Sequence, residues 1–274
     1  MALNPRWYSL SLCALILMFS GCVTKPEIIP PSTILETGDY VVVPVYYGTD
    51  RVMESERHYG HKYGESVTVG MCMVGIPWAR RPGQSSMSSL WSADDPVRNI
   101  VLQKTVLLDH ERYFANLKQE IKLRKEVLVY VHGFNASFED AARSMGQIKY
   151  DLGFNGLAVF FSWPSRGDIS PTGYMHDKDV ISASSKHLRS FLKELSKAGA
   201  ESIHIIAHSM GNVALLQALA DMSREFPSLE KPVFGEVMLI APDMNVDAFK
   251  LFAQDLRKIA KRSTLYASSK DKAL

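Results

Sequence analysis

The sequence predicts an α/β fold with a mostly parallel central sheet. From residue 127 onward, short apolar runs such as VLVYV (127–131) and SIHIIAH (202–208) alternate with longer amphipathic segments. Continuous apolar runs are typical of strands that are buried on both faces of a parallel sheet. Strands that alternate with helices favour parallel pairing through crossover helices, and such sheets carry ligand chemistry at the carboxyl ends of their strands.

The elements can be placed in order from apolar periodicity and turn residues. Ser137, with Asp140 three residues later, is expected to cap a helix in a pattern close to a capping box. The polar segments 79–96 and 165–177 are expected to be loops, the second a short lid region at most. We expect strands at 40–50, 66–77, 100–109, 127–131, 157–163, 202–208, 235–242 and 263–268, and helices at 111–125, 137–153, about 178–197, 210–223 and 247–261.

Composition narrows the function classes. The chain has 274 residues, of which 46% are hydrophobic, and a net charge of +2. These values suit one globular domain, and the near-neutral charge gives no reason to expect a nucleic-acid partner. His58 and His61 lie close in sequence but lack Cys or acidic ligands at convincing spacing, so no metal is expected. No segment indicates a nucleotide or another organic cofactor.

The first residues have the pattern of an export signal. Arg6 is followed by the apolar run LSLCALILMF (10–19), which is short for a membrane span. FSGC (19–22) resembles a bacterial lipobox, with Phe19 in place of the usual Leu, and this implies cleavage before Cys22 and its lipidation. We therefore expect a signal peptide at 1–21, a proline-containing tether at 22–38, a domain at 39–274 and a bacterial cell-envelope location. A plain signal peptide or an uncleaved anchor is the alternative.

The segment AHSMG (207–211) predicts a nucleophile elbow. Such a turn displays a serine between a strand and a helix and needs small residues two positions before and after it, here Ala207 and Gly211. The helix N-terminus that follows favours a developing anion near Ser209. The alternative is that Ser209 only caps the helix.

The segment VYVHGFNASFED (129–140) predicts the other half of an oxyanion hole. In α/β hydrolases an HG-type loop donates a backbone N–H there, which would be that of Phe134, paired with the N–H of Met210. We expect His132 to hold this loop rather than to act as the general base.

Two aspartates follow predicted strands and are candidates for the triad acid. Asp271 follows the last strand, and Asp243 follows the strand before it. We favour Asp271, although either residue can instead cap a helix.

Six segments together resemble a bacterial α/β-hydrolase family of unknown function, the DUF900 group, from about Tyr40 to the last residue. They are YYGTDR (46–51), 127–154, FFSWPSRG (160–167), IHIIAHSMGN (203–212), APDMNVDAF (241–249) and LYASSKDKAL (265–274). The resemblance implies an α/β-hydrolase fold with Ser209 as nucleophile and Asp271 as acid. It does not supply a substrate.

The sequence departs from this family at the expected base. The resemblance implies a histidine after a further strand, beyond residue 274, whereas all eight histidines here precede Ser209. We therefore expect a chain truncated at its C-terminus, without the last strand and the catalytic histidine. The main hypothesis is a serine hydrolase that acts on a small ester, thioester or amide. The alternatives are a non-catalytic envelope protein on the same fold and a truncated gene product.

Overall fold

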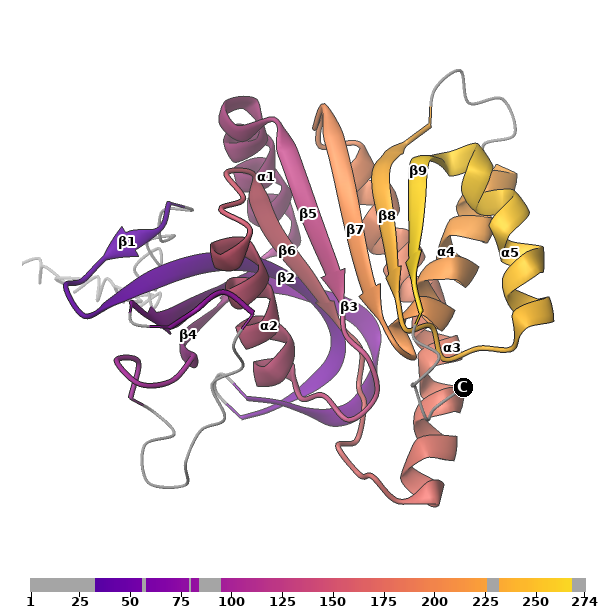
Figure 1. Ribbon diagram of the computed structural model, residues 1–274, viewed down its shortest axis with the longest axis horizontal. Helices are drawn as coiled ribbons and strands as arrows, with labels where there is room; N and C mark the ends of the chain where they lie inside the picture. Colours follow the sequence, from indigo (N-terminus) through magenta and orange to yellow (C-terminus); the bar gives the residue numbers. More distant parts are fainter. Residues whose placement is uncertain (1–32, 56–57, 79, 84–94, 226–231, 268–274) are drawn as a thin grey trace, which may run out of the picture.

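A computed structural model describes residues 33–55, 58–78, 80–83, 95–225 and 232–267. Within them the chain forms one sheet in the order β4-β3-β2-β6-β5-β7-β8-β9, and a short strand β1 (Leu35–Glu36) pairs with β2 (Figure 1). Adjacent strands are parallel throughout the run β2-β6-β5-β7-β8-β9. Strand β3 is antiparallel to both β2 and β4. The predicted α/β fold with a mostly parallel sheet is therefore confirmed.

The described elements follow the predicted order. The strands are β2 (Tyr40–Ser55), β3 (His58–Pro77), β4 (Val101–Leu108), β5 (Glu126–Val131), β6 (Leu157–Ser162), β7 (Ser202–His208), β8 (Phe234–Ile240) and β9 (Ala260–Tyr266). The helices are α1 (His110–Arg124), α2 (Phe138–Asp151), α3 (Pro171–Ser196), α4 (Gly211–Glu225) and α5 (Val246–Ile259). None of these helices is both long and apolar enough to cross a membrane.

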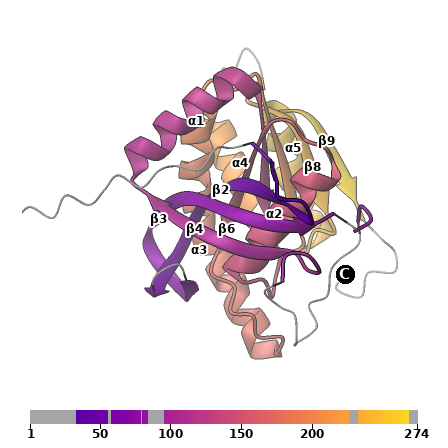
Figure 2. The same ribbon diagram turned by 90° about the vertical axis from the view of Figure 1, so that its left-hand side faces the viewer.

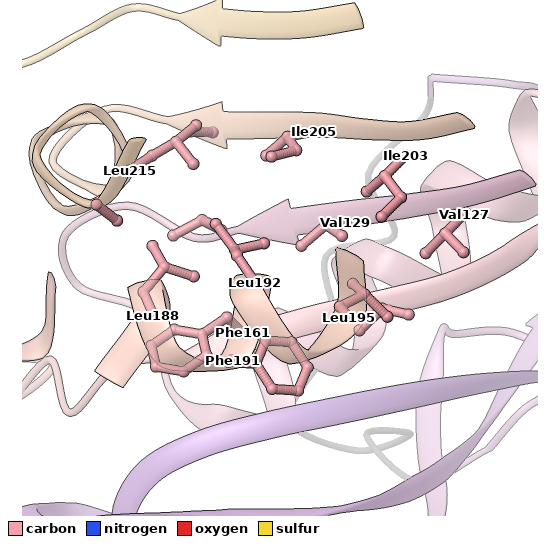
Figure 3. Close-up of a cluster of buried hydrophobic side chains, with 14 of the residues drawn as sticks. Val127, Val129, Phe161, Leu188, Phe191, Leu192, Leu195, Ile203, Ile205 and Leu215 are labelled. Atoms are coloured by element: carbon pink, nitrogen blue, oxygen red, sulfur yellow. The ribbon is translucent and has the colours of Figure 1, made fainter. Parts of the chain in front are cut away.

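Helices cover both faces of the sheet, as predicted. Alternate residues of β5 point to opposite faces, so Val127 and Val129 join one core and Leu128 joins the other. The first core packs against α1, α3, α4 and α5, and the second packs against α2. Figure 3 shows the β5 and β7 side chains of the first core facing Leu192 and Leu195 of α3. Because these strands are buried on both faces, their sequences are unbroken apolar runs.

The strands β2 and β3 are longer than the sequence predicted. They lie side by side as a curved ribbon that runs to Ser55 and starts again at His58, eight residues before the predicted strand at 66 (Figures 1 and 2). The pairing register shifts three times between Thr49 and Ser55. These bulges break the period-two pattern by which a strand is recognised in sequence, so the extension could not be seen there.

The helix α3 begins at Pro171, whereas the sequence placed its start near 178. Ser170 accepts a hydrogen bond from the Gly173 N–H and caps the helix, and Pro171 occupies the first turn. Proline is typical of loops but is also favourable in the first helical turn. The expected lid region is therefore partly helix. The predicted cap of α2 is confirmed, because Ser137 and Asp140 form a reciprocal capping box.

The sheet order brings the predicted site segments together. Strand β5 pairs with β7, and β7 pairs with β8, all parallel. Their carboxyl ends therefore share one edge of the sheet, and the loops at 132–137, 209–210 and 241–245 emerge there side by side.

Candidate active site

Ser209 occupies a sharp turn between β7 and α4. Its φ angle is +48°, in the left-handed region that residues other than glycine rarely adopt. Its N–H donates to the Ile240 carbonyl at 2.9 Å, which ties the turn to the end of β8. Such a backbone conformation costs about 1–3 kcal/mol and persists only where the surroundings impose it.

Asn212 supplies much of that constraint. Its side chain is fully buried, and its Nδ2 donates to the Ser209 carbonyl at 2.8 Å and to the Ile240 carbonyl at 3.1 Å. One amide group thus connects the turn, the first turn of α4 and the end of β8. No role was expected for Asn212 from the sequence. Its position directly after the AHSMG segment was the available signal.

Gly211, beside the turn, is required by close backbone contacts. A Cβ on Gly211 would lie against the His132 carbonyl and 2.9 Å from the Val131 carbonyl oxygen. Both contacts are far closer than real Cβ atoms approach, and Ala207 on the other side is completely buried. The end of β5 therefore fits against the start of α4 only because no larger side chain separates them.

The loop after β5 lies directly against Ser209. A Cβ on Gly133 would come within 2.9 Å of Ser209 Cβ and 2.8 Å of His208 Nδ1. The next residue, Phe134, and Met210 each have a backbone N–H that donates to no group among the described residues. The two predicted oxyanion donors are therefore not used by helical or strand pairing.

His132 holds this loop. The ring is buried, its Nδ1 lies 2.8 Å from the Gly133 carbonyl oxygen, and its Nε2 lies 3.2 Å from Ser162 Oγ. It stacks on Trp163 with ring centroids 5.1 Å apart. Burial, together with the nearby Arg51 cation, lowers the pKa of His132 to about 3, so the ring is neutral at physiological pH. Its hydrogen bonds and its position make it a structural element of the loop, as the sequence suggested.

Asp243, the second candidate acid, lies near the turn and is held by a tyrosine. The Tyr174 hydroxyl donates to Asp243 Oδ2 at 2.7 Å, and the Asp243 N–H approaches the Ser209 carbonyl at 3.4 Å. The Tyr174 ring also packs edge-to-face on Phe134, with centroids 5.4 Å apart. Burial and the Asp243 contact raise the pKa of Tyr174 to about 12, so the hydroxyl keeps its proton. Asp271 lies outside the described residues, as does Cys22.

The described histidines do not hydrogen-bond to the Ser209 hydroxyl. His208 is exposed, and its ring is on the face of the sheet that carries α2. His176 is half-buried beside Asp177, with Nδ1 and Oδ1 3.5 Å apart. His204 accepts from the Glu236 N–H, farther from the carboxyl end of β7. Among the described residues no three His, Cys, Asp or Glu side chains gather to hold a metal ion.

Two open hollows lie near the carboxyl edge of the sheet, and Ser209 is in the wall of neither. One of about 600 Å³ has His208, Ile206 and Ile240 in its wall. The other, of about 610 Å³, is lined by Lys178, Val213, Asp243, Met244, Asn245, Val246, Ala248 and Phe252. Small molecules bind in concave sites of this size that combine apolar walls with a few polar groups. Both hollows begin at residues adjacent to Ser209 or to its hydrogen-bond partners.

The sheet order and the segments at its carboxyl edge define an α/β-hydrolase-like protein. A family model described as an α/β hydrolase of unknown function, DUF900, matches residues 110–274. The chain belongs to this family. A search of curated proteins found no significant match.

Proposed function

We propose that this protein is a serine hydrolase that transfers acyl groups from small esters, thioesters or amides to water through Ser209. The observation that carries the proposal is the turn itself: Ser209 has a φ of +48° between β7 and α4, with the Gly133 backbone against its side chain. A nucleophile elbow requires this geometry. Strain of this kind concentrates at functional sites.

The proposed reaction begins with attack of Ser209 Oγ on the substrate carbonyl carbon. The hydroxyl proton passes to a general base, and the carbonyl oxygen becomes an anion that the Phe134 and Met210 N–H groups stabilise. Collapse of this intermediate expels the alcohol, thiol or amine, which takes the proton, and water then hydrolyses the acyl-serine. Preorganised amide donors of this type contribute a factor of about 10²–10³ each.

The general base is proposed to be a histidine that an aspartate orients. Asp271 is the proposed acid, and Asp243 is the alternative. The Tyr174 contact favours a different role for Asp243, because one of its carboxylate oxygens already accepts a hydrogen bond. Without a base, a serine hydroxyl keeps its proton at neutral pH and is a weak nucleophile.

Turnover of carboxylic esters tests this function. The full-length protein, in the membrane fraction of the organism that makes it, should hydrolyse activated esters of graded acyl length, and Ser209→Ala should abolish the activity. The matched control is Ser185→Ala, which removes a buried hydroxyl in α3 that donates to the Ser182 carbonyl. A protein that is folded, inert and functionally unaffected in the cell by Ser209→Ala would support the non-catalytic envelope role instead.

We also propose that the protein is attached to the bacterial cell envelope by lipid on Cys22. The support is the FSGC segment after the apolar run at 10–19. Cys22→Ala should move the protein from the membrane fraction to the soluble fraction. Mass spectrometry of the mature N-terminus should find acyl groups on Cys22, and an unmodified Cys22 would reject the proposal.

A further inference from the structure

A buried arginine lies beneath the proposed oxyanion loop. Arg51, in β2, is 1% exposed, and its guanidinium donates to the Gly60, Ser165 and Ala136 carbonyls at 3.0, 3.2 and 2.7 Å. Burial lowers its pKa to about 10, so it remains a cation at neutral pH. Burying a cation is unfavourable unless its hydrogen bonds are satisfied. The remaining donor, Nε, connects this cation to the loop through Ser162.

Nε of Arg51 begins a chain of hydrogen bonds. Arg51 Nε donates to Ser162 Oγ at 2.8 Å, and Ser162 Oγ lies 3.2 Å from His132 Nε2. A guanidinium has no acceptor, so Ser162 must accept from Arg51. Ser162 Oγ has a second lone pair, so the direction of its bond to His132 Nε2 is set by which ring nitrogen carries the proton.

The other side of the imidazole sets the tautomer. Nδ1 of His132 lies 2.8 Å from the Gly133 carbonyl oxygen, which can only accept. Nδ1 must therefore carry the ring proton. Because the buried ring is neutral, Nε2 is bare and accepts the Ser162 proton, so every bond in the chain points from the Arg51 cation towards the Gly133 carbonyl.

The Gly133 carbonyl and the Phe134 N–H are the two ends of one planar peptide unit. Holding the carbonyl in one direction fixes the N–H in the opposite direction. A hydrogen bond to the carbonyl also polarises the unit and strengthens its N–H as a donor, because bonds in a chain reinforce one another. Arg51 additionally holds the far side of the loop through the Ala136 carbonyl.

We propose that Arg51, Ser162 and His132 are positioning residues that orient and polarise the Phe134 N–H for an oxyanion. This inference rests on the proposed function of Ser209. None of the three residues needs to touch the substrate, because their effect passes through the Gly133–Phe134 peptide. The sequence segments YYGTDR and FFSWPSRG, which had no assigned role, contribute Arg51 and Ser162 to this chain.

Ser162→Ala tests the chain, because it removes the central hydroxyl and leaves both neighbours in place. We expect fluorophosphonate labelling of Ser209 to slow about tenfold, since a donor is weakened rather than deleted. Ser162→Thr keeps a hydroxyl and should restore most of the rate. Ser185→Ala, the matched buried control, should label within about twofold of wild type, because its hydroxyl donates within α3.

Nitrogen-15 NMR of the full-length protein gives a readout that does not need activity. His132 should show a proton on Nδ1 and none on Nε2, and the Phe134 amide proton should move upfield in Ser162→Ala but not in Ser185→Ala. A proton on Nε2, or an unchanged Phe134 amide, would overturn the inference even if Ser209 is active. If wild-type Ser209 is not labelled, the proposed function fails, and these spectra still decide the proton arrangement. If Ser162→Ala does not fold, the inference is tested by the His132 spectrum of the wild type and by the labelling rate of Ser162→Thr.

Discussion

The backbone of Gly133 is in van der Waals contact with the side chain of Ser209, so a single added carbon at Gly133 would reach 2.9 Å from Ser209 Cβ. This contact sets the distance between the proposed nucleophile and the loop that carries the Phe134 amide. A methyl group added at Gly133 would therefore disturb the site.

Gly133→Ala should therefore impair the site more than the fold. The new Cβ would also meet the His208 carbonyl at 3.1 Å, so the loop must move away from Ser209. We expect the rate of fluorophosphonate labelling to fall by at least about tenfold. The control is Gly199→Ala, where a Cβ meets open space and only the positive φ of +89° is unfavourable. Equal labelling rates in the two variants would contradict the close contact.

Asn212 should stabilise the turn through its two donated hydrogen bonds. Asn212→Ala removes both and should lower the free energy of unfolding by about 2 kcal/mol. Asn212→Asp places a carboxylate against the Ser209 and Ile240 carbonyls and should be more destabilising than alanine. Urea unfolding should find wild type most stable, Asn212→Ala less stable and Asn212→Asp least stable. An aspartate variant as stable as wild type would reject the assigned amide orientation.

His132 should make stability depend on pH. Its pKa is about 3 when folded, against 6.5 for an unperturbed histidine. Above pH 6.5 the ring is neutral in both states, so it adds no pH dependence there. Below pH 6.5 only the unfolded state takes up the proton, and stability is lost as the pH falls towards 3. Between pH 7 and pH 5 this loss should be about 2 kcal/mol.

The measurement compares urea unfolding of wild type and His132→Asn at these two pH values. Asparagine cannot titrate, so the loss that remains in the variant belongs to other groups, and the difference between the two proteins isolates His132. Equal losses in both proteins would show that His132 is not a buried neutral ring.

The two candidate acids should differ in their effect on Ser209. Asp271→Asn should slow labelling of the full-length protein by about 10²–10⁴, because the base would lose its orienting carboxylate. Asp243→Asn removes the charge from the 2.7 Å contact with the Tyr174 hydroxyl, Tyr174→Phe removes the contact itself, and both should have smaller effects than Asp271→Asn. The reverse order would transfer the acid role to Asp243.

The sequence predicted the sheet because its strands depend on local patterns. The apolar runs at 127–131 and 202–208 became β5 and β7 within one residue, and Gly211 lies where a larger side chain would meet the backbone of β5 and its following loop. Arg51, Asn212 and Tyr174 could not be predicted from one sequence. Each acts through a partner that is distant along the chain or through a backbone carbonyl, and neither kind of contact leaves a local pattern.

The start of α3 shows a second limit. Pro171 and Gly173 are loop signals unless the residue before them caps a helix, and the capping role of Ser170 depends on where the chain turns after β6. That turn is fixed by buried contacts, such as the Ser165 hydroxyl with the Asp177 carboxylate. Tertiary packing therefore decided a boundary that propensity alone placed seven residues later.

Covalent labelling tests most directly whether Ser209 is a nucleophile. The full-length protein in its native membrane is treated with a fluorophosphonate, and the modified peptide is identified by mass spectrometry, with Ser209→Ala and Ser185→Ala treated in parallel. We expect one modified residue, Ser209, in the wild type and in Ser185→Ala, and none in Ser209→Ala. An unmodified Ser209 in the folded wild-type protein, or labelling that survives Ser209→Ala at the same rate, would contradict it.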